Sequence, residues 1–392
     1  MSEIYFDNSA TTKVSIEAAE AALKAMRENY GNASSLHGKG LTAARCLAQA
    51  RRSMASLLGA AEKEIIFNSS ASEGNNTVLF GVAAAHGKKG GSILVSAVEH
   101  PSVLEPAKLL AQKGFTVQTV AVDNWGRIDL SDLANKLTAD TILVSCQHIN
   151  NETGVRQPVE KIGALVKSNS QAFFHIDGVQ GFAKLPVDLA VCKADFYTAS
   201  GHKIHAPKGV GLLWIKNGVR INPLIYGGGQ EKNQRSGTEN IPGIEAFAVA
   251  AQAAAANRAS NLVAVKQVRD TLWFKLCELL PDVICNSDLA GESSPYVLNV
   301  SFPGAKSEVL LHYLEERKIY VSSGSACHSS KNKASHVLLA MGIPQELADC
   351  SIRYSFCPQN TVAEAQTVAE ATAEIVKEIR RYSVGEKQKN RR

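Results

Sequence analysis

The stretch "ASGHKIHAPKG", Ala199 to Gly209, places Lys203 between two histidines at the end of an apolar run, and then closes on proline and glycine. A lysine in a loop is ordinarily a solvated charge, because lysine is among the residues most often left exposed. In sheets built from alternating strands and helices, however, ligands bind beyond the carboxyl ends of the strands. If the apolar run is a strand, Lys203 stands at such an end, so the segments around it decide its role.

Seven apolar runs, rich in Val, Ile and Phe, alternate with longer helical patterns between Glu64 and about Ile215. They are EIIFNSS (64–70), SILVSAVEH (92–100), FTVQTVAV (115–122), TILVSCQHIN (141–150), AFFHID (172–177), ADFYTAS (194–200) and GVGLLWI (209–215). Strands that alternate with helices form a mostly parallel sheet that helices cover on both faces. We therefore predict an α/β protein whose large domain holds a mostly parallel seven-stranded sheet.

The sequence after Ile244 predicts a connection and a smaller α/β domain. The Ala-rich pattern from Ile244 to about Leu280 indicates one long helix or two abutting helices. A strand (YVLNVSF), a helix (SEVLLHYLEERK), a Gly/Ser loop, a strand (SIRYSF) and a last helix from Val362 to about Tyr382 follow. We place the large domain at 15–260 and the small domain at 261–382, with residues 1–14 packing nearby and a disordered basic tail at 383–392.

The composition excludes several classes of protein. Of the 392 residues, 45% are hydrophobic and 20% are charged, which is typical of a globular protein in water. The chain has no long apolar stretch and no secretory signal at its start, so we expect a cytoplasmic protein without membrane contact. The net charge of +5 is dispersed, which argues against direct nucleic-acid binding. Eight scattered cysteines predict neither a disulfide framework nor a metal site.

Asp177 is the partner that gives Lys203 a chemical role. It ends the run AFFHID and lies 203 − 177 = 26 residues before Lys203, which leaves room for one crossover and the next strand. A carboxylate and a lysine at neighbouring strand ends suit pyridoxal 5'-phosphate, whose ring nitrogen pairs with the acid and whose aldehyde condenses with the amine. The pair therefore predicts a pyridoxal phosphate site.

Further polar residues follow the predicted strands. NSSASEGNN opens a helix, so the amides of Ala71 and Ser72 can bind the cofactor phosphate, although the same letters fit a plain capping box. Ser200 and His202 can add donors to that phosphate. Among the remaining candidates are His100, whose ring can stack on a flat cofactor, Asn151, whose amide can donate hydrogen bonds, and Arg353, whose fork suits a carboxylate.

Nine motifs together carry a resemblance to a known family. They are YFDNSATT, GNASSLH, NSSASEGNN, EHPSVL, NNETG, HIDGVQ, SGHKIHAPKGVG, GGGQEKNQRSGTEN and SSGSAC. The chain resembles the cysteine desulfurases of the class V aminotransferases, which implies a fold-type I transferase that uses pyridoxal phosphate. The resemblance implies that Lys203 forms the Schiff base, Asp177 pairs with the ring nitrogen, Gln180 contacts the phenolic oxygen and His100 stacks on the ring.

The same resemblance implies the remaining roles. Ala71, Ser72, Ser200 and His202 would hold the phosphate, Thr238 would reach it across a homodimer interface, and Asn151 and Arg353 would bind the substrate carboxylate. Lys203 would remove the α-proton of L-cysteine, and Cys327 of SSGSAC would take its sulfur as a persulfide. A sulfur-acceptor protein, in iron–sulfur cluster assembly or tRNA thiolation, would be the partner. The alternatives are a selenocysteine lyase or small-amino-acid transaminase on the same fold, and a non-catalytic scaffold.

Four positions depart from the family pattern. Ser72 stands where the family usually has threonine, and Ala33 stands where proline is common. Phe356 and Cys357 replace the usual Leu-Gly pair after Arg353. We expect the last departure to lie near the substrate carboxylate, where it would bear on the amino-acid preference.

Overall fold

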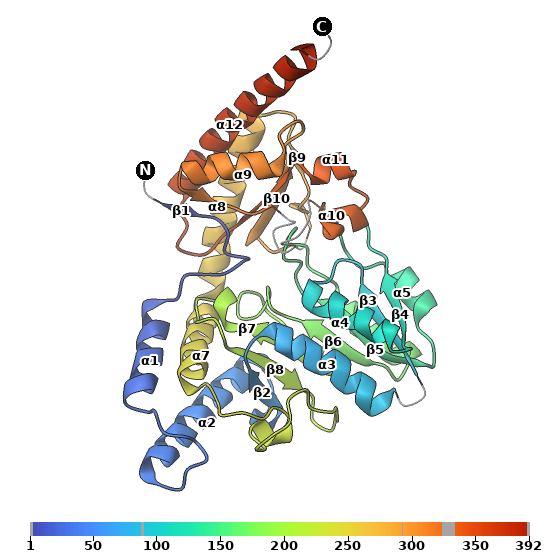
Figure 1. The fold of residues 1–392 in the computed structure, drawn as a ribbon, viewed down its shortest axis with the longest axis vertical. Coiled ribbons are helices and arrows are strands. Elements are labelled where there is room, and N and C mark those ends of the chain that lie inside the picture. Colours follow the sequence, from blue (N-terminus) through green and yellow to red (C-terminus); the bar gives the residue numbers. More distant parts are fainter. Residues whose placement is uncertain (1–2, 88–89, 292, 324–333, 390–392) are drawn as a thin grey trace.

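The computed structural model describes residues 3–87, 90–291, 293–323 and 334–389. Figure 1 shows two units, a larger one that contains strands β2 to β8 and a smaller one that lies next to both ends of the chain. Helix α8 (Arg258–Leu279) runs from the larger unit into the smaller one. The chain thus leaves the larger unit along a single helix.

The larger unit is built on a seven-stranded sheet with the strand order β2-β8-β7-β6-β5-β3-β4. Its strands are β2 (Ile65–Asn68), β3 (Ser92–Ser96), β4 (Thr116–Val120), β5 (Thr141–Gln147), β6 (Phe173–Asp177), β7 (Phe196–Ser200) and β8 (Gly211–Ile215). β8 runs antiparallel to both of its neighbours, and the other pairings are parallel. The predicted α/β fold is confirmed, and each apolar run contains one strand.

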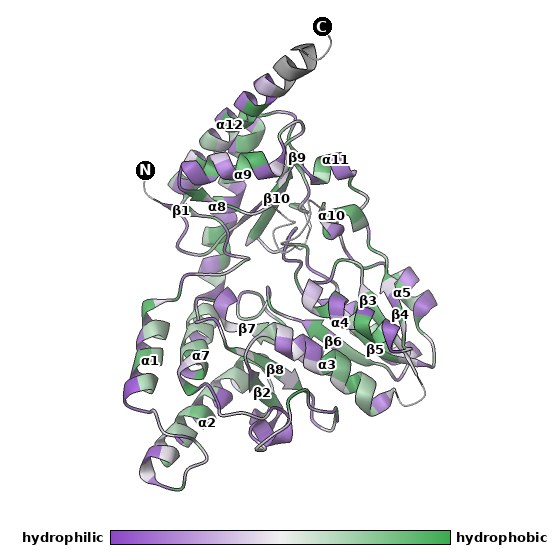
Figure 2. Cartoon of the chain, in the orientation of Figure 1, coloured by the Kyte–Doolittle hydropathy of each residue, from purple (hydrophilic) through white to green (hydrophobic). Residues whose placement is uncertain are grey.

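Helices cover both faces of this sheet, because successive strand residues point to opposite sides. In β2, Ile65 and Phe67 join a core on one face and Ile66 joins a core on the other. The first core includes α2 (Gly38–Leu58), α6 (Val159–Asn169) and α7 (Ile241–Ala256), and the second includes α3 (Ala71–His86) and α4 (Pro101–Gln112). In Figure 2, α2, α3 and α4 carry both hydrophilic and hydrophobic residues, as expected of helices that pack on one side only.

Two further helices belong to the larger unit, α1 (Ile16–Arg27) and α5 (Leu130–Lys136). The Ala-rich connection is two helices rather than one, since α7 ends at Asn257, whose φ of −99° and ψ of 12° depart from helical values. α8 then starts at the next residue. Of the two alternatives open from the sequence, the abutting pair is the one observed.

The smaller unit has its own core between a short antiparallel sheet and three helices. The sheet order is β12-β10-β9. The elements are β9 (Ile284–Cys285), β10 (Val297–Ser301), α9 (Ser307–Glu316), α10 (His336–Ala340), α11 (Gln345–Ala348), β12 (Ser351–Ser355) and α12 (Val362–Lys389). Leu272 of α8, Leu310 of α9 and Val376 of α12 meet in this core.

The N-terminal segment packs on the smaller unit. Strand β1 (Ile4–Tyr5) pairs in parallel with β11 (Ile319–Tyr320), and Ile4 and Phe6 belong to the core of the smaller unit. The segment then crosses to the larger unit, where Thr12 Oγ1 donates to the carbonyl of His202. It therefore passes directly over the end of β7.

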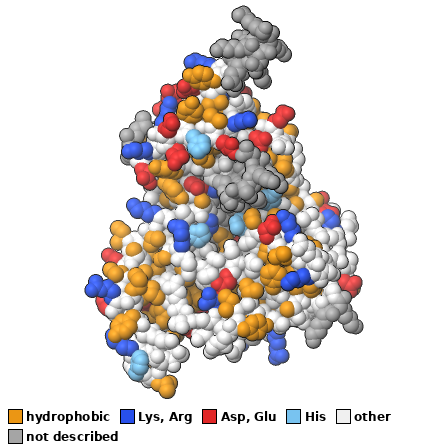
Figure 3. Space-filling model, in the orientation of Figure 1, with side chains coloured by type: hydrophobic (Ala, Val, Ile, Leu, Met, Phe, Trp, Pro, Cys, Tyr) orange, Lys and Arg blue, Asp and Glu red, His pale blue; other side chains and the backbone are white. Residues whose placement is uncertain are grey.

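In the part of the chain that the structure describes, no helix has the length and apolar content needed to cross a membrane. Among the same residues, no group of three or more His, Cys, Asp or Glu side chains is arranged around a metal position. The cysteines described there are all free. Figure 3 shows acidic and basic side chains interspersed over the face in view, in keeping with a mild, dispersed net charge.

Candidate active site

The carboxyl ends of the parallel strands surround a cavity of about 370 Å³, which we call the site cavity. Ten of the twelve predicted site residues line it: Ala71, Ser72, His100, Asn151, Asp177, Gln180, Ser200, His202, Lys203 and Arg353. Asp177 ends β6 and Ser200 ends β7, and these two strands are direct neighbours in the sheet. Residues from both units therefore meet at the edge where α/β sheets bind ligands.

Lys203 is held by the N-terminal segment. It closes the short 3-10 helix Gly201–Lys203, which follows β7 directly. Its Nζ donates to the carbonyl oxygens of Ser9 and Ala10, at 2.6 and 2.7 Å. Ser9 and Ala10 also line the site cavity. The motif YFDNSATT thus shapes the surroundings of the lysine, a role that the sequence alone did not assign to it.

Asp177 is oriented by a buried asparagine. Its Oδ2 accepts from Asn75 Nδ2 at 2.8 Å, and its Oδ1 accepts from the backbone amide of Val179 at 3.0 Å. Asn75 is fully buried on α3, and its Oδ1 accepts from the Thr198 hydroxyl at 2.6 Å. That contact fixes which end of the amide carries the donors. Asn75 was missed in the sequence, although it lies within the quoted motif NSSASEGNN.

The same asparagine reaches His100. Asn75 Nδ2 donates to Ser102 Oγ at 2.9 Å, and Ser102 Oγ lies 2.8 Å from His100 Nδ1. The backbone amide of Ser102 also donates to Nδ1, because His100 is the N-cap of α4. Burial lowers the pKa of His100, and nearby Asp177 opposes that shift. We assign the neutral ring with its proton on Nε2, since Nδ1 accepts.

The start of α3 serves two of the predicted roles. Ser70 is its N-cap and accepts from the amide of Glu73, while the Glu73 carboxylate accepts from the amide and hydroxyl of Ser69. Ser70 therefore caps the helix as predicted, but the Glu73 carboxylate binds Ser69 and not the amide of Ser70, so the reciprocal capping box is not formed. This cap leaves the amides of Ala71 and Ser72, which have no intrahelical acceptor in the first turn and which line the site cavity. Capping and anion binding are compatible here.

His202 is a neutral side chain beside the lysine. Its Nδ1 lies 3.2 Å from Thr11 Oγ1. Burial, and then the charge of Lys203, lower the pKa of His202 to about 4. A neutral imidazole can donate to a phosphate oxygen without adding a charge to a site that already contains a lysine.

Arg353 reaches the cavity from β12 of the smaller unit. Its Nη2 donates to Asp7 Oδ1 at 2.8 Å, and its Nη1 donates to the carbonyl of Asn151 at 3.2 Å. Within the described residues, no hydrogen-bond partner reaches its Nε, and the residue is only 4% exposed. An unsatisfied buried donor of a guanidinium favours an anionic ligand. The expected Asn151 is therefore present, but the contact observed with Arg353 uses its backbone oxygen.

The remaining two predicted site residues are Thr238 and Cys327. Thr238 is exposed on the single chain and lies outside the residues that line the cavity. Cys327 lies outside the described residues. Their roles stay predictions.

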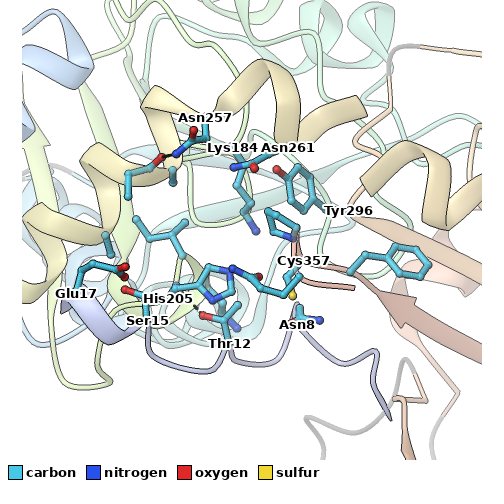
Figure 4. Close-up of a pocket in the computed structure, with 18 residues that line it drawn as sticks. Asn8, Thr12, Ser15, Glu17, Lys184, His205, Asn257, Asn261, Tyr296 and Cys357 are labelled. Carbon is cyan, nitrogen blue, oxygen red and sulfur yellow. Dashed lines mark hydrogen bonds between the residues drawn. The ribbon is translucent and has the colours of Figure 1, made fainter. Parts of the chain in front are cut away.

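Phe356 and Cys357 line a different cavity from the one that contains Arg353. Phe356 is buried against Phe6, with ring centroids 5.1 Å apart. Both residues border a second cavity of about 260 Å³, which also takes in Lys184 and Tyr296 (Figure 4). Lys203 lines both cavities. Phe356 and Cys357, the residues that depart from the family pattern, therefore lie beside Lys203 in the second cavity and not in the cavity that Arg353 lines.

The residues present fit pyridoxal phosphate. One cavity combines an amine, an oriented carboxylate, a neutral imidazole, free helix-start amides and an arginine with an unsatisfied donor. The Gln180 side chain also lines it, with Nε2 donating to the carbonyl of Ser9 at 3.1 Å. These are the groups that a phosphorylated pyridine aldehyde and an amino-acid carboxylate require.

Comparison with known proteins points to one family. The aminotransferase class-V family model matches residues 4–368. A cysteine desulfurase of Trichormus azollae is 41% identical over 383 residues, which cover 98% of this chain and 95% of the relative. The cysteine desulfurase IscS of Methanosarcina thermophila is 40% identical over 380 residues, covering 97% of this chain and 93% of that protein.

Solved structures agree with these relatives. A NifS-like protein has a TM-score of 0.91 at 38% identity and covers 96% of this chain and 100% of its own. SspA in complex with cysteine has a TM-score of 0.80 at 30% identity, with coverage of 91% and 99%. The chain belongs to the class-V aminotransferase family and, within it, to the cysteine desulfurases.

Proposed function

We propose that this chain is a pyridoxal-phosphate-dependent cysteine desulfurase whose active site is the site cavity. The observation that carries the proposal is that Lys203 and Asp177, at the ends of neighbouring strands, line one cavity with Arg353 of the smaller unit. Cysteine desulfurase is also the printed name of relatives at about 40% identity over nearly the whole chain. SspA, a structural neighbour, is described in complex with cysteine, which supports L-cysteine as the substrate.

Each part of the cofactor would have its own binding residues in the cavity. The Lys203 amine would form the bond to the aldehyde, and the Asp177 carboxylate would pair with the ring nitrogen. Gln180 would donate to the phenolic oxygen, and the His100 ring would stack on the cofactor ring. The amides of Ala71 and Ser72, with Ser200 and His202, would hold the phosphate. When bound, pyridoxal phosphate supplies a ring that accepts electrons from the substrate carbon. The Asn75 contact keeps the Asp177 carboxylate in place for the ring nitrogen.

Arg353 would bind the substrate carboxylate. Its Nε donor lacks a partner, and its fork is held in place by Asp7 and by the Asn151 carbonyl. A guanidinium carries five N–H donors, so it can keep these two contacts and still donate hydrogen bonds to a ligand. Lys203 Nζ would take the α-proton of the bound amino acid.

We further propose that the Cys327 thiol takes the sulfur. The overall step is L-cysteine plus enzyme thiol giving L-alanine plus enzyme persulfide, so atoms and charges balance without an outside oxidant. Thiol reactivity follows the thiolate fraction, and His328, Lys331 and Lys333 follow Cys327 in the sequence as basic neighbours. A sulfur-acceptor protein, of a cluster-assembly or tRNA-thiolation pathway, would then remove the persulfide.

The proposed enzyme is a cytoplasmic homodimer. Thr238 is exposed on the single chain. That exposure is what a residue needs if it is to reach the phosphate site of a second copy. The dimer would therefore complete the phosphate-binding set of each active site.

The deciding experiment incubates the purified protein with L-cysteine and dithiothreitol and quantifies alanine and sulfide. We expect equal amounts of both, and a yellow protein at the start. Alanine formation only from selenocysteine would favour the lyase alternative. Amino transfer to a keto acid, without sulfide, would favour the transaminase, and a colourless, inert protein would favour the scaffold.

A further inference from the structure

Lys184 is a second lysine next to the site, and it contacts Gln180. Lys184 Nζ donates to Gln180 Oε1 at 3.2 Å, and the two residues are four positions apart in the segment after β6. The other end of the same amide, Nε2, donates to the carbonyl of Ser9 at 3.1 Å. A lysine amine carries N–H donors in either protonation state, and the Ser9 carbonyl is an acceptor only. Both contacts therefore enforce one orientation of the Gln180 amide.

We propose that Lys184 is a positioning residue that acts through Gln180. By holding Oε1, it keeps the donor end of the amide on the side of the site cavity, where the phenolic oxygen of the cofactor would accept from it. The inference rests on the proposed function for the identity of that acceptor. Without Lys184, the amide could turn over and present its own oxygen to an oxygen, which is repulsive.

The backbone directly before Lys184 adopts a strained conformation. Ala183, directly before it, has a φ of 58°, in the left-handed region that residues with a Cβ avoid. The Ala183 carbonyl accepts from Arg258 Nε at 3.4 Å, so a side chain at the start of α8 secures the turn. A strained residue that the surroundings hold in place is a feature of functional sites. Lys184, which contacts Gln180, is the next residue after this strained position.

Lys184 is half-buried at the edge of the second cavity. Its Nζ lies 5.2 Å from the centre of the Tyr296 ring, and it lines the second cavity together with Cys357 (Figure 4). Burial, and then the charge of Lys203, lower the pKa of Lys184 to about 7. An amine that is partly removed from water gains from the hydrogen bonds that it makes. The Gln180 carbonyl is one of them.

The test uses four proteins beside the wild type: Lys184→Met, Lys184→Arg, Gln180→Leu and the Lys184→Met/Gln180→Leu double variant. Each is stripped of cofactor and titrated with pyridoxal phosphate, and the visible spectrum of the loaded protein is recorded. Loss of one properly oriented hydrogen bond should weaken cofactor binding by roughly three- to tenfold. We expect that loss, and a shifted visible band, in Lys184→Met, with recovery of both in Lys184→Arg.

The double variant decides how Lys184 acts. If it acts through Gln180, Lys184→Met should add nothing in the Gln180→Leu background. An equal loss in both backgrounds, or a Lys184→Met protein that matches the wild type in affinity and spectrum, overturns the inference. Lys161→Met, at an exposed lysine of α6, is the matched control and should match the wild type.

This experiment distinguishes failure of the inference from failure of the proposed function. If the wild type binds no pyridoxal phosphate, the proposed cofactor site is wrong, and the Lys184–Gln180 interaction is tested on the cofactor-free protein. There the side-chain amide resonances of ¹⁵N-labelled Gln180, assigned with Gln180→Leu, should move in Lys184→Met. Unmoved resonances would show that Lys184 does not orient the amide.

Discussion

Arg353 of β12 donates through Nη2 to Asp7 Oδ1 at 2.8 Å, and so ties the arginine expected to bind substrate to the N-terminal segment. The Asp7 side chain is 20% exposed and that of Arg353 only 5%. Ser9 and Ala10 of the same segment accept from Lys203 through their backbone carbonyls. One short stretch of chain therefore holds both Arg353 of the smaller unit and Lys203 of the larger unit.

Arg353→Ala should weaken apparent cysteine binding and leave the resting spectrum unchanged. Loss of a charge-assisted hydrogen-bond partner costs about 1.5–3 kcal/mol, which corresponds to roughly a ten- to hundredfold rise in KM. Steady-state kinetics with L-cysteine measures it. Arg353→Lys, which keeps the charge and loses the fork, should fall in between. An unaltered KM would assign Arg353 to structure.

Lys203→Ala should abolish the covalent link to the cofactor. We expect the variant to purify without the visible band of the wild type, or with cofactor that dialysis removes. Borohydride treatment followed by mass spectrometry measures the link directly. A reducible bond to the protein that survives in the variant would place the linkage at another lysine, for which Lys184 is the first candidate because it lines the neighbouring cavity.

Cys327→Ser separates a desulfurase from a transaminase. The variant should keep the cofactor spectrum and bind cysteine, yet form no protein persulfide and release no sulfide with dithiothreitol present. Cys357→Ser is the matched control, because burial raises the pKa of the Cys357 thiol and disfavours the reactive thiolate. Wild-type desulfuration by Cys327→Ser would mean that this thiol is not the sulfur acceptor.

Asn75→Ala should make the position of the Asp177 carboxylate, the proposed partner of the cofactor ring nitrogen, less well fixed. Asp177 Oδ2 and Ser102 Oγ would each lose a donor inside the protein, at a cost of about 1–3 kcal/mol for unsatisfied buried groups. We expect a lower melting temperature together with weaker pyridoxal phosphate binding. Asn76→Ala, at the adjacent and less buried residue, is the control. Cofactor affinity equal to that of the wild type would show that Asp177 holds its position without Asn75.

Glu99→Gln tests a buried acid beside the site. Glu99 Oε1 accepts from the amide of Gln147, Oε2 has no partner, and burial followed by Asp177 raises the pKa of this carboxyl well above 4.5. The folded state thus keeps a proton that the unfolded chain releases. Since the unfolded state then binds fewer protons, stability falls as pH rises from about 4.5 towards the folded pKa.

The glutamine variant cannot ionise at position 99. The urea concentration at its unfolding midpoint, relative to that of the wild type, should therefore increase as pH rises from 5 to 8. Urea unfolding at a series of pH values measures the difference. Parallel pH profiles for the two proteins would show that Glu99 has no raised pKa in the folded state.

The sequence by itself determined the seven strands, because alternation of apolar runs with helical patterns is a local signal that each segment carries independently. It also determined that Lys203 and Asp177 stand at strand ends, and parallel pairing then brings such ends to one edge. The choice between one and two helices at Asn257 was not determined, since the Ala-rich composition suits either.

Only the tertiary structure decided the contacts that orient the site. Arg353 and Asp7 are 346 positions apart, and Asn75 and Asp177 are 102 apart, so no local pattern pairs them. The same holds for Phe356 and Cys357, which border the second cavity although they follow Arg353 closely in sequence. A hydrogen bond between side chains depends on how elements pack and which way an amide turns, whereas strand formation depends mainly on residues within the strand itself.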